Sequence, residues 1–311
     1  MNNPQPQQQS NSKNSSLSPP LAGLLFAIAS AALFAVRPIF VKLVYAEGVD
    51  TTTLIAFRML FSAPIYLLLL LFFLRNANLR ARLKISNIIK IAGVGLLGYY
   101  VASFLDLLGL QYVTAQLGRM ILYTYPTFVV LLGAILFSEP ITKRIVLALG
   151  ITYLGTAIIF GHDLNSFGKD VLLGGAFIVA CAISFSFYLV YSKNLIHEVG
   201  SRLFTCIALL CASIGILTHY AITHGNIANA QINQRATWLI LIIAIFCTVI
   251  PTFFTTAAVA RIGANQTGIV ATIGPAFTSV AAVIILGEAF TLYHLAGIAL
   301  TVGGVAILQL K

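Results

Sequence analysis

Residues 109–160, GLQYVTAQLGRMILYTYPTFVVLLGAILFSEPITKRIVLALGITYLGTAIIF, match residues 258–309, AVARIGANQTGIVATIGPAFTSVAAVIILGEAFTLYHLAGIALTVGGVAILQ. The offset is 149 (264 minus 115), and at this offset the first segment shares several residues with the second: Ala115, Pro126, Phe128, Glu139, Thr142, Thr152 and Gly155 meet Ala264, Pro275, Phe277, Glu288, Thr291, Thr301 and Gly304. A weaker match at an offset of 151 pairs Phe34 and Lys42 with Phe185 and Lys193. Two unrelated apolar stretches share residues through composition, but not Pro, Glu, Thr and Gly at one register. We therefore interpret the two halves as an internal repeat.

The composition around this repeat predicts a membrane protein. The chain has 311 residues, of which 59% are hydrophobic and 8% are charged. A soluble domain carries roughly 25% charged residues, so a soluble enzyme is excluded, and the apolar content excludes a disordered chain. The four cysteines lie in apolar stretches and form no CxxC motif, so we interpret them as small buried hydrophobes. A polytopic protein of the lipid bilayer is the remaining class.

The lengths of the apolar segments predict ten membrane spans. A membrane helix needs about 20 mostly apolar residues, and backbone groups in a bilayer must be satisfied within the segment, which forces an all-α fold. The expected spans are 21–44, 52–74, 88–110, 113–136, 143–161, 171–191, 203–222, 237–258, 266–286 and 292–310.

Each repeat unit contains five of these spans. Because five is odd, the second unit enters the membrane in the opposite direction, so we predict two inverted five-helix repeats over residues 21–161 and 171–310. Residues 1–20 are rich in Gln, Asn, Ser and Pro and are expected to form a disordered tail. Inverted repeats are a recurrent design of secondary transporters, with the substrate site at the repeat interface.

The basic residues predict the orientation. If the N-terminus is cytoplasmic, the outer loops hold only Lys169 and Arg235, and the cytoplasmic segments hold twelve basic residues: Lys13, Arg75, Arg80, Arg82, Lys84, Lys90, Lys143, Arg144, Lys193, Arg202, Arg261 and Lys311. We expect a multi-pass protein of the cell inner (cytoplasmic) membrane with both termini in the cytoplasm. The net charge of +10 is then a topology signal, and nucleic acid is not an expected partner.

Two short motifs at the ends of the matching segments resemble a known family. Tyr125-Pro126 precedes Ser138-Glu139-Pro140, and Gly274-Pro275 precedes Gly287-Glu288-Ala289. Over residues 21–310 the chain resembles the drug/metabolite transporter (DMT) superfamily, EamA type. The resemblance implies a ten-helix transporter, often an exporter of amino acids or other small metabolites, although some relatives import and others carry nucleotide sugars or lipid-linked sugars. Arg119 departs from the pattern, because many relatives have a small residue there, as Gly268 is here.

Five ionisable residues fall within the expected spans, where charge is costly and indicates function: Arg37, Lys42, Arg58, Asp106 and Arg119. Lys42 lies near a span end, so its side chain is expected to reach the interface. The other four lie at similar depth, roughly 6 to 10 Å from the outer ends of their spans at about 1.5 Å per residue. We interpret them as a positively biased cavity for an anionic group, most simply a carboxylate, which guanidinium binds bidentately.

A structural alternative is an internal network. Asp106 would pair with Arg119 or Arg37, and Arg58 would reach toward Asp50 or Glu47. One aspartate cannot neutralise three arginines, which favours the anion-site interpretation for the group as a whole.

Polar side chains at helical spacing extend this candidate site. The substrate-binding candidates Tyr99, Tyr123 and Tyr188 share helix faces with Asp106, Arg119 and Ser184, respectively. Tyrosines in the interfacial belt are the alternative. Pro126, Pro251, Gly274 and Pro275 interrupt spans, and we predict hinges there for alternating access, with static bends as the alternative.

The sequence favours a transporter over an enzyme. Asp106 is the one carboxylate within an expected span, so it is the candidate for proton coupling, although adjacent arginines argue against this and facilitated diffusion is compatible. There is no P-loop, no cofactor or metal motif, and no paired acid and base at membrane depth. A lipid or lipid-linked sugar carrier, and a non-transporting scaffold or receptor, are the alternative functions. The oligomeric state, the direction and the substrate are not specified.

Overall fold

The computed structural model describes residues 19–81, 83–138 and 140–309. The tail predicted for residues 1–20 therefore lies outside the described residues, apart from Pro19 and Pro20, which begin the first helix. Glu139, in the first of the two repeated motifs, also lies outside them.

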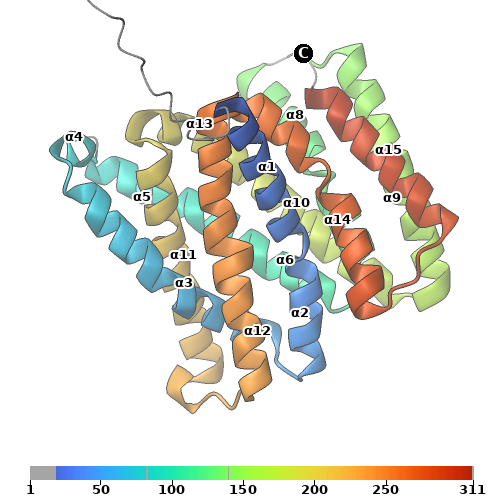
Figure 1. Ribbon diagram of the computed structural model, residues 1–311, viewed down its shortest axis with the longest axis horizontal. Helices are drawn as coiled ribbons and strands as arrows, with labels where there is room; N and C mark the ends of the chain where they lie inside the picture. The colour runs from blue at the N-terminus through green and yellow to red at the C-terminus, as the bar shows by residue number, and fades with distance from the viewer. Residues whose placement is uncertain (1–18, 82, 139, 310–311) are drawn as a thin grey trace, which may run out of the picture.

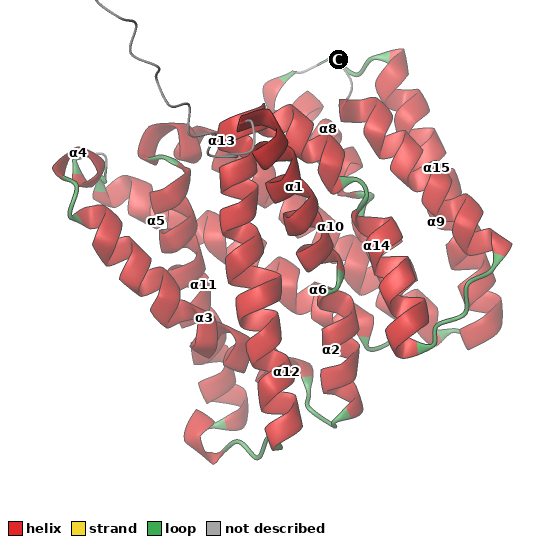
Figure 2. Cartoon of the chain, viewed as in Figure 1, coloured by secondary structure: helices red, strands yellow, loops and turns green. Residues whose placement is uncertain are grey.

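Every regular element in the described part of the chain is helical, and no strand occurs there (Figure 2). The first repeat contains α1 (Pro19–Ala35), α2 (Arg37–Ala46), α3 (Thr51–Leu74), α4 (Ala77–Arg80), α5 (Ile85–Gly95), η1 (Leu96–Val101), α6 (Ala102–Leu110), α7 (Ala115–Leu122), α8 (Tyr125–Phe137) and α9 (Lys143–Phe167). The second contains α10 (Asp170–Val199), α11 (Ser201–His224), η2 (Ile227–Asn229), α12 (Gln234–Ala244), η3 (Ile245–Val249), α13 (Ile250–Ala271), α14 (Gly274–Ala281), η4 (Ala282–Leu286) and α15 (Leu292–Gln309).

These helices form ten apolar segments. Within the described ranges, nine are long and apolar enough to cross a membrane, and a shorter apolar helix, Leu292–Ile307, follows them. Gly263, with φ of 81°, separates the eighth segment from the ninth inside α13. The prediction of an all-α membrane protein with ten transmembrane helices in two inverted repeats is confirmed.

The packing of the helices has the pattern of a two-fold axis between the repeats. Three spans pack against their own counterparts: the second against the seventh (α3 with α11), the fourth against the ninth (α7 with α14) and the fifth against the tenth (α9 with α15). The other main contacts exchange under the same operation, because α1 packs against α13 and α6 packs against α10. Each of the ten spans thus packs against a span of the other repeat, and Figure 1 shows α9 and α15 side by side at one edge.

The two ends of the bundle differ in charge. Figure 1 shows α4 at the upper end, and α2 and the start of α12 at the lower end. We call the end that carries Lys84, Lys143, Arg144, Arg202 and Arg261 the basic face, and the other end the opposite face.

Small residues allow the fifth and tenth spans to approach closely. A Cβ atom added to Gly155 would lie 2.6 Å from the Gly297 carbonyl oxygen, and one added to Gly304 would lie 2.6 Å from the Ala148 carbonyl oxygen. Association of helices in a bilayer depends on such close packing, because lipid gives no hydrophobic drive between them.

Three spans are broken near their middle, and each break is followed by a proline. The chain leaves the helix at Val36 before Pro38, at Tyr123 and Thr124 before Pro126, and at Thr272 and Ile273 before Pro275. In contrast, Pro251 lies in a continuous span, just after the π-helix η3. The breaks at Pro126 and Pro275 fall at two of the predicted hinges, whereas the break at Pro38 was not anticipated. Their role in motion stays a prediction.

Candidate functional site

The break in the first span exposes backbone carbonyls inside the bundle. Pro38 has no N–H, so the Phe34 carbonyl, four residues earlier, loses its helical donor. Arg119 of α7 supplies one, with Nη2 2.6 Å from the Phe34 oxygen. The next carbonyl, Ala35, accepts a hydrogen bond from Thr278 Oγ1 of α14 at 2.8 Å. Side chains from both repeats therefore complete the broken backbone, as a membrane interior requires.

The break in the ninth span is completed in the same way. Pro275 removes the donor for the Ala271 carbonyl, and Tyr123 Oη donates to that oxygen at 2.7 Å. Gly274 permits the approach, because a Cβ atom there would lie 2.6 Å from Tyr123 Oη. The breaks of the first, fourth and ninth spans thus interlock at the interface between the repeats.

An ion pair lies beside the first break. Arg37, the first residue of α2, donates through Nη2 to Asp106 Oδ2 of α6 at 2.5 Å. The side chains are 20% and 10% exposed, respectively, so the pair is largely removed from solvent. Of the two partners considered for Asp106, the structure selects Arg37.

Arg58 is the unusual charge of the site. It is 2% exposed, and among the residues that the structure describes it has no salt-bridge partner and its Nε has no hydrogen-bond acceptor. The alternative in which Arg58 reaches toward Glu47 or Asp50 is wrong, because Glu47 pairs with Arg235 at 3.1 Å and Asp50 lies 3.5 Å from His224.

The four charged groups form one electrostatic unit. Arg37 and Asp106 are close enough to influence both Arg58 and Arg119. Arg119 Nε also lacks an acceptor, although its Nη2 is bound to Phe34. Of the three arginines, only Arg37 has a salt-bridge partner among the described residues, and that partner is Asp106. A buried charge is normally paired, so Arg58 and Arg119 are the unusual members of the group. We call these four residues the arginine cluster.

The predicted tyrosines do not all join this cluster. Tyr123 contacts it through the neighbouring break, as described above. Tyr99 and Tyr188 instead bind each other, with their Oη atoms 2.8 Å apart and their ring centroids 5.1 Å apart. They pack with Ile91 and Phe204 in a hydrophobic cluster. This pair bridges the third and sixth spans, so its substrate-binding role stays a prediction.

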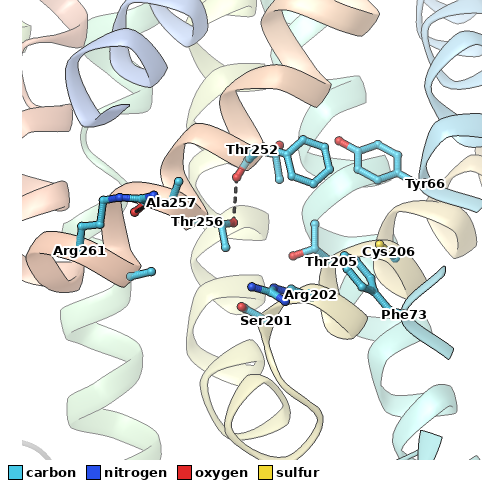
Figure 3. Close-up of a pocket in the computed structure, with 12 residues that line it drawn as sticks. Tyr66, Phe73, Ser201, Arg202, Thr205, Cys206, Thr252, Thr256, Ala257 and Arg261 are labelled. Atoms are coloured by element: carbon cyan, nitrogen blue, oxygen red, sulfur yellow. Dashed lines mark hydrogen bonds between the residues drawn. The ribbon is translucent and has the colours of Figure 1, made fainter. Parts of the chain in front are cut away.

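A pocket lies toward the basic face, separate from the arginine cluster, and Figure 3 shows residues that line it. Its volume is 390 Å³, and it lies between α3, α11 and α13. Tyr66 lines its inner part, about 12 Å along α3 from Arg58. Arg202 and Arg261 line it nearer the basic face, together with hydroxyls such as Thr256, and among the described residues no Asp or Glu lines it. Sequence reasoning did not find this pocket, because Arg202 and Arg261 were interpreted only as topology signals.

The statement that Asp106 is the one carboxylate within a span is wrong. Helix α9 continues to Phe167, beyond the expected end at residue 161, and Asp163 on this extension is 0% exposed. The acid is stabilised there because Thr114 Oγ1 donates to Asp163 Oδ2 at 2.8 Å. Two histidines in the sequence could have indicated a polar site at this end. They are His162, which is adjacent to Asp163, and His294, near the start of the tenth span.

Glu288, from the second of the two repeated motifs, caps a helix of the other repeat. It accepts hydrogen bonds at the start of α7 from Ala115 N at 2.7 Å and Gln116 N at 3.3 Å. A carboxylate at a helix N-terminus is favourable because it complements the helix dipole.

Comparisons with known proteins agree with this architecture. The model of the EamA-like transporter family matches residues 21–161 and again residues 172–310. The chain belongs to the EamA-like transporter family. It is a multi-pass membrane transporter, and the resemblance to the EamA-type drug/metabolite transporters is confirmed.

Two similar proteins are named as uncharacterized transporters. The uncharacterized transporter YcbK of Bacillus subtilis is 24% identical over 279 residues, with 89% of each chain covered. The uncharacterized transporter YdfC of the same organism is 26% identical, with 85% of this chain and 84% of the relative covered. A solved crystal structure shares the fold, with a TM-score of 0.63, 17% identity, and coverage of 93% of this chain and 96% of the other.

Proposed function

We propose that this EamA-like protein is a secondary transporter that exports a small carboxylate-bearing metabolite, such as an amino acid or a related anion, across the cytoplasmic membrane by alternating access. The observation that carries the proposal is the arginine cluster. A transporter of a neutral solute has no need for three arginines and only one carboxylate within its spans. A carboxylate substrate supplies the missing negative charge and the planar geometry that guanidinium matches.

Arg58 is the residue proposed to take the substrate carboxylate. Arg37 is already occupied by Asp106, and Arg119 is bound to the Phe34 carbonyl. Arg58 is buried and has no described partner, so binding an anion recovers the cost of its desolvation. Arg119 contributes positive charge and its remaining donors.

The basic-face pocket supports entry from the cytoplasm. The distribution of Lys and Arg favours a cytoplasmic basic face, and the pocket extends from Arg202 and Arg261 near that face to Tyr66, on the same helix as Arg58. Arg202 and Arg261 near the opening raise the local concentration of anions. Export is therefore the favoured direction, with the breaks at Pro126 and Pro275 as hinges between the inward-open and outward-open states.

Facilitated diffusion is the favoured way of driving transport, because it needs no proton-carrying group. Asp106, the candidate proton carrier in the cluster, is engaged in an ion pair with Arg37.

The test is uptake and efflux of amino acids and organic anions in vesicles that contain the purified protein. Wild-type protein is expected to transport one class of carboxylate, and Arg58→Gln is expected to abolish this transport. Arg75→Gln is the matched control, because Arg75 is an exposed arginine at the other end of the same helix. The proposal fails if no carboxylate is transported, or if a folded Arg58→Gln protein transports as well as wild type.

A lipid or lipid-linked sugar carrier is the second candidate. A 400 Å³ apolar cavity lies between α8, α9 and α10, lined by residues such as Phe128, Tyr153 and Phe160. It offers a site for acyl chains at the edge of the bundle. Movement of a labelled lipid between leaflets by both wild type and Arg58→Gln would favour this function. A scaffold or receptor would transport nothing in either assay.

A further inference from the structure

Two histidines and an aspartate meet at the opposite face, apart from the arginine cluster. His162 and Asp163 lie near the end of α9, and His294 lies near the start of α15. One nitrogen or oxygen atom from each lies within 4.8 Å of the others. Asp163 is 0% exposed and His294 is 2% exposed, whereas the side chain of His162 is 21% exposed. The proposed transport function uses none of the three.

The separations within this His–Asp–His cluster fit ligands of a metal better than a strong ion pair. His162 Nδ1 lies 3.2 Å from Asp163 Oδ1, and His294 Nε2 lies 3.5 Å from the same oxygen. Charge-assisted hydrogen bonds are shorter, about 2.7–2.9 Å. A tetrahedral ion with ligands at about 2.0–2.2 Å places neighbouring ligand atoms roughly 3.3–3.6 Å apart.

Neighbouring hydroxyls hold two of the groups in place. Thr114 Oγ1 donates to Asp163 Oδ2 at 2.8 Å, which leaves Oδ1 directed at the histidines. His294 Nδ1 accepts a hydrogen bond from Thr291 N at 3.2 Å and lies 2.9 Å from Thr291 Oγ1. These contacts orient the ring, and binding of a metal at Nε2 would require the tautomer with its proton on Nδ1, which would then donate to Thr291 Oγ1 in place of the bond from Thr291 N. Metal-binding histidines are commonly oriented by a hydrogen bond at the other ring nitrogen.

The charge balance also favours a cation. Asp163 is fully buried, and among the described residues no Lys or Arg forms a salt bridge with it. Glu288 is a further acidic group near His294. A divalent ion would balance the buried carboxylate without requiring either imidazole to be protonated.

We propose that His162, Asp163 and His294 bind one divalent transition-metal ion of the zinc type. His162 Nδ1, Asp163 Oδ1 and His294 Nε2 supply three ligands, and a water completes a tetrahedral site on the side where His162 is exposed. The ion links α9 of the first repeat to α15 of the second, and through Thr114 to the start of α7. It is a structural or regulatory site at the opposite face, and it does not depend on the proposed substrate.

The test uses the full-length protein in detergent after treatment with a chelator. Titration with ZnCl₂ in a calorimeter is expected to show one saturable site per chain, and Co²⁺ is expected to give the visible absorption of a tetrahedral complex. His294→Gln and His162→Gln are each expected to weaken Zn²⁺ binding by more than the roughly 10- to 100-fold caused by loss of an outer-shell partner. Because His162 is partly exposed, its replacement is the milder test if His294→Gln fails to fold.

His224→Gln is the matched control. His224 Nε2 lies 3.5 Å from Asp50 Oδ1, the same separation as in the cluster, and in the described residues no third ligand accompanies this pair. The His224→Gln protein is expected to bind Zn²⁺ as tightly as wild type does. The proposal is overturned if wild type shows no saturable binding, or if folded His162→Gln and His294→Gln proteins bind as tightly as wild type, which would place the ion elsewhere, for example at the cysteines.

Discussion

The hydrogen bond between Arg119 and the Phe34 carbonyl can be tested through Pro38. If Arg119 replaces the N–H that Pro38 lacks, restoring that N–H should reduce the dependence of the fold on Arg119. The perturbation is therefore a double-mutant cycle of Arg119→Met and Pro38→Ala. Methionine keeps an apolar stem of similar length and removes the guanidinium.

The magnitude follows from the carbonyl that is left without a donor. In Arg119→Met, the Phe34 oxygen loses its 2.6 Å partner, and a buried unsatisfied group costs about 1–3 kcal/mol. In Pro38→Ala, the Ala N–H is four residues beyond Phe34 and can donate to it, so this cost is avoided in the double variant. We expect a coupling free energy of about 2 kcal/mol. The coupling does not depend on how much removal of a buried charge stabilises the protein, because that effect cancels in the cycle.

The assay is equilibrium unfolding in mixed micelles with increasing SDS, followed by circular dichroism. Thr152→Val is the control in place of Arg119→Met, because Thr152 Oγ1 binds the Ala148 carbonyl within α9, away from Pro38. The change in the free energy of unfolding caused by Thr152→Val should add to the change caused by Pro38→Ala within about 0.5 kcal/mol. A coupling below about 0.5 kcal/mol between Pro38→Ala and Arg119→Met would refute the reasoning.

The same double variant separates the two roles of Arg119. It is expected to keep the fold but lack a guanidinium of the arginine cluster. If Arg119 contributes to the proposed anion site, carboxylate transport by the double variant falls although its stability is retained. If transport is unchanged, Arg119 serves only to satisfy the broken backbone.

Three further predictions concern stability. Glu288→Gln is expected to lower the free energy of unfolding by about 1 kcal/mol through loss of a charged helix cap, measured by SDS titration, whereas exposed Glu198→Gln has no effect. Gly155→Val should cost about 1–3 kcal/mol or more in the same assay, because its Cβ would lie 2.6 Å from a backbone oxygen of α15, whereas Gly150→Val, with nothing within 4 Å, should cost less than 1 kcal/mol. Burial raises the pKa of Asp50, but hydrogen bonds from the first turn of α3 outweigh it, so the pKa lies below its ordinary value of 3.8. The stability that Asp50 contributes is present above that value and is lost as the pH falls through the folded-state pKa. Thermal unfolding at a series of pH values should therefore show that the melting temperature falls less on acidification in Asp50→Asn than in wild type.

The sequence predicted the fold better than the site. The spans followed from apolar length, and the two-unit organisation followed from residues that recur at one offset, including Pro126 with Pro275. The importance of Arg37, Arg58, Asp106 and Arg119 followed from the cost of charge in a bilayer. Their partners could not be predicted from the sequence, because Asp106 had several arginines within reach and Arg58 had two acids near its span end.

The break at Pro38 shows what local signals can miss. Proline near the start of a helix and proline inside a span look alike in sequence, since both follow an apolar run. Only the packed structure shows that the Phe34 and Ala35 carbonyls are completed by Arg119 and Thr278. Arg119 is 85 residues from Phe34, and Thr278 is 243 residues from Ala35.

The sequence by itself determined that this chain crosses a membrane as two inverted units of five helices and that a few charges lie inside the bilayer. Hydropathy and recurrence determine these properties, because they depend on the length and order of the segments. Only the tertiary structure decided that Asp106 pairs with Arg37, that Arg58 is left without a counter-charge, and that His162, Asp163 and His294 converge. These depend on which helix faces meet across the repeat interface, and close packing between spans far apart in the chain sets that choice.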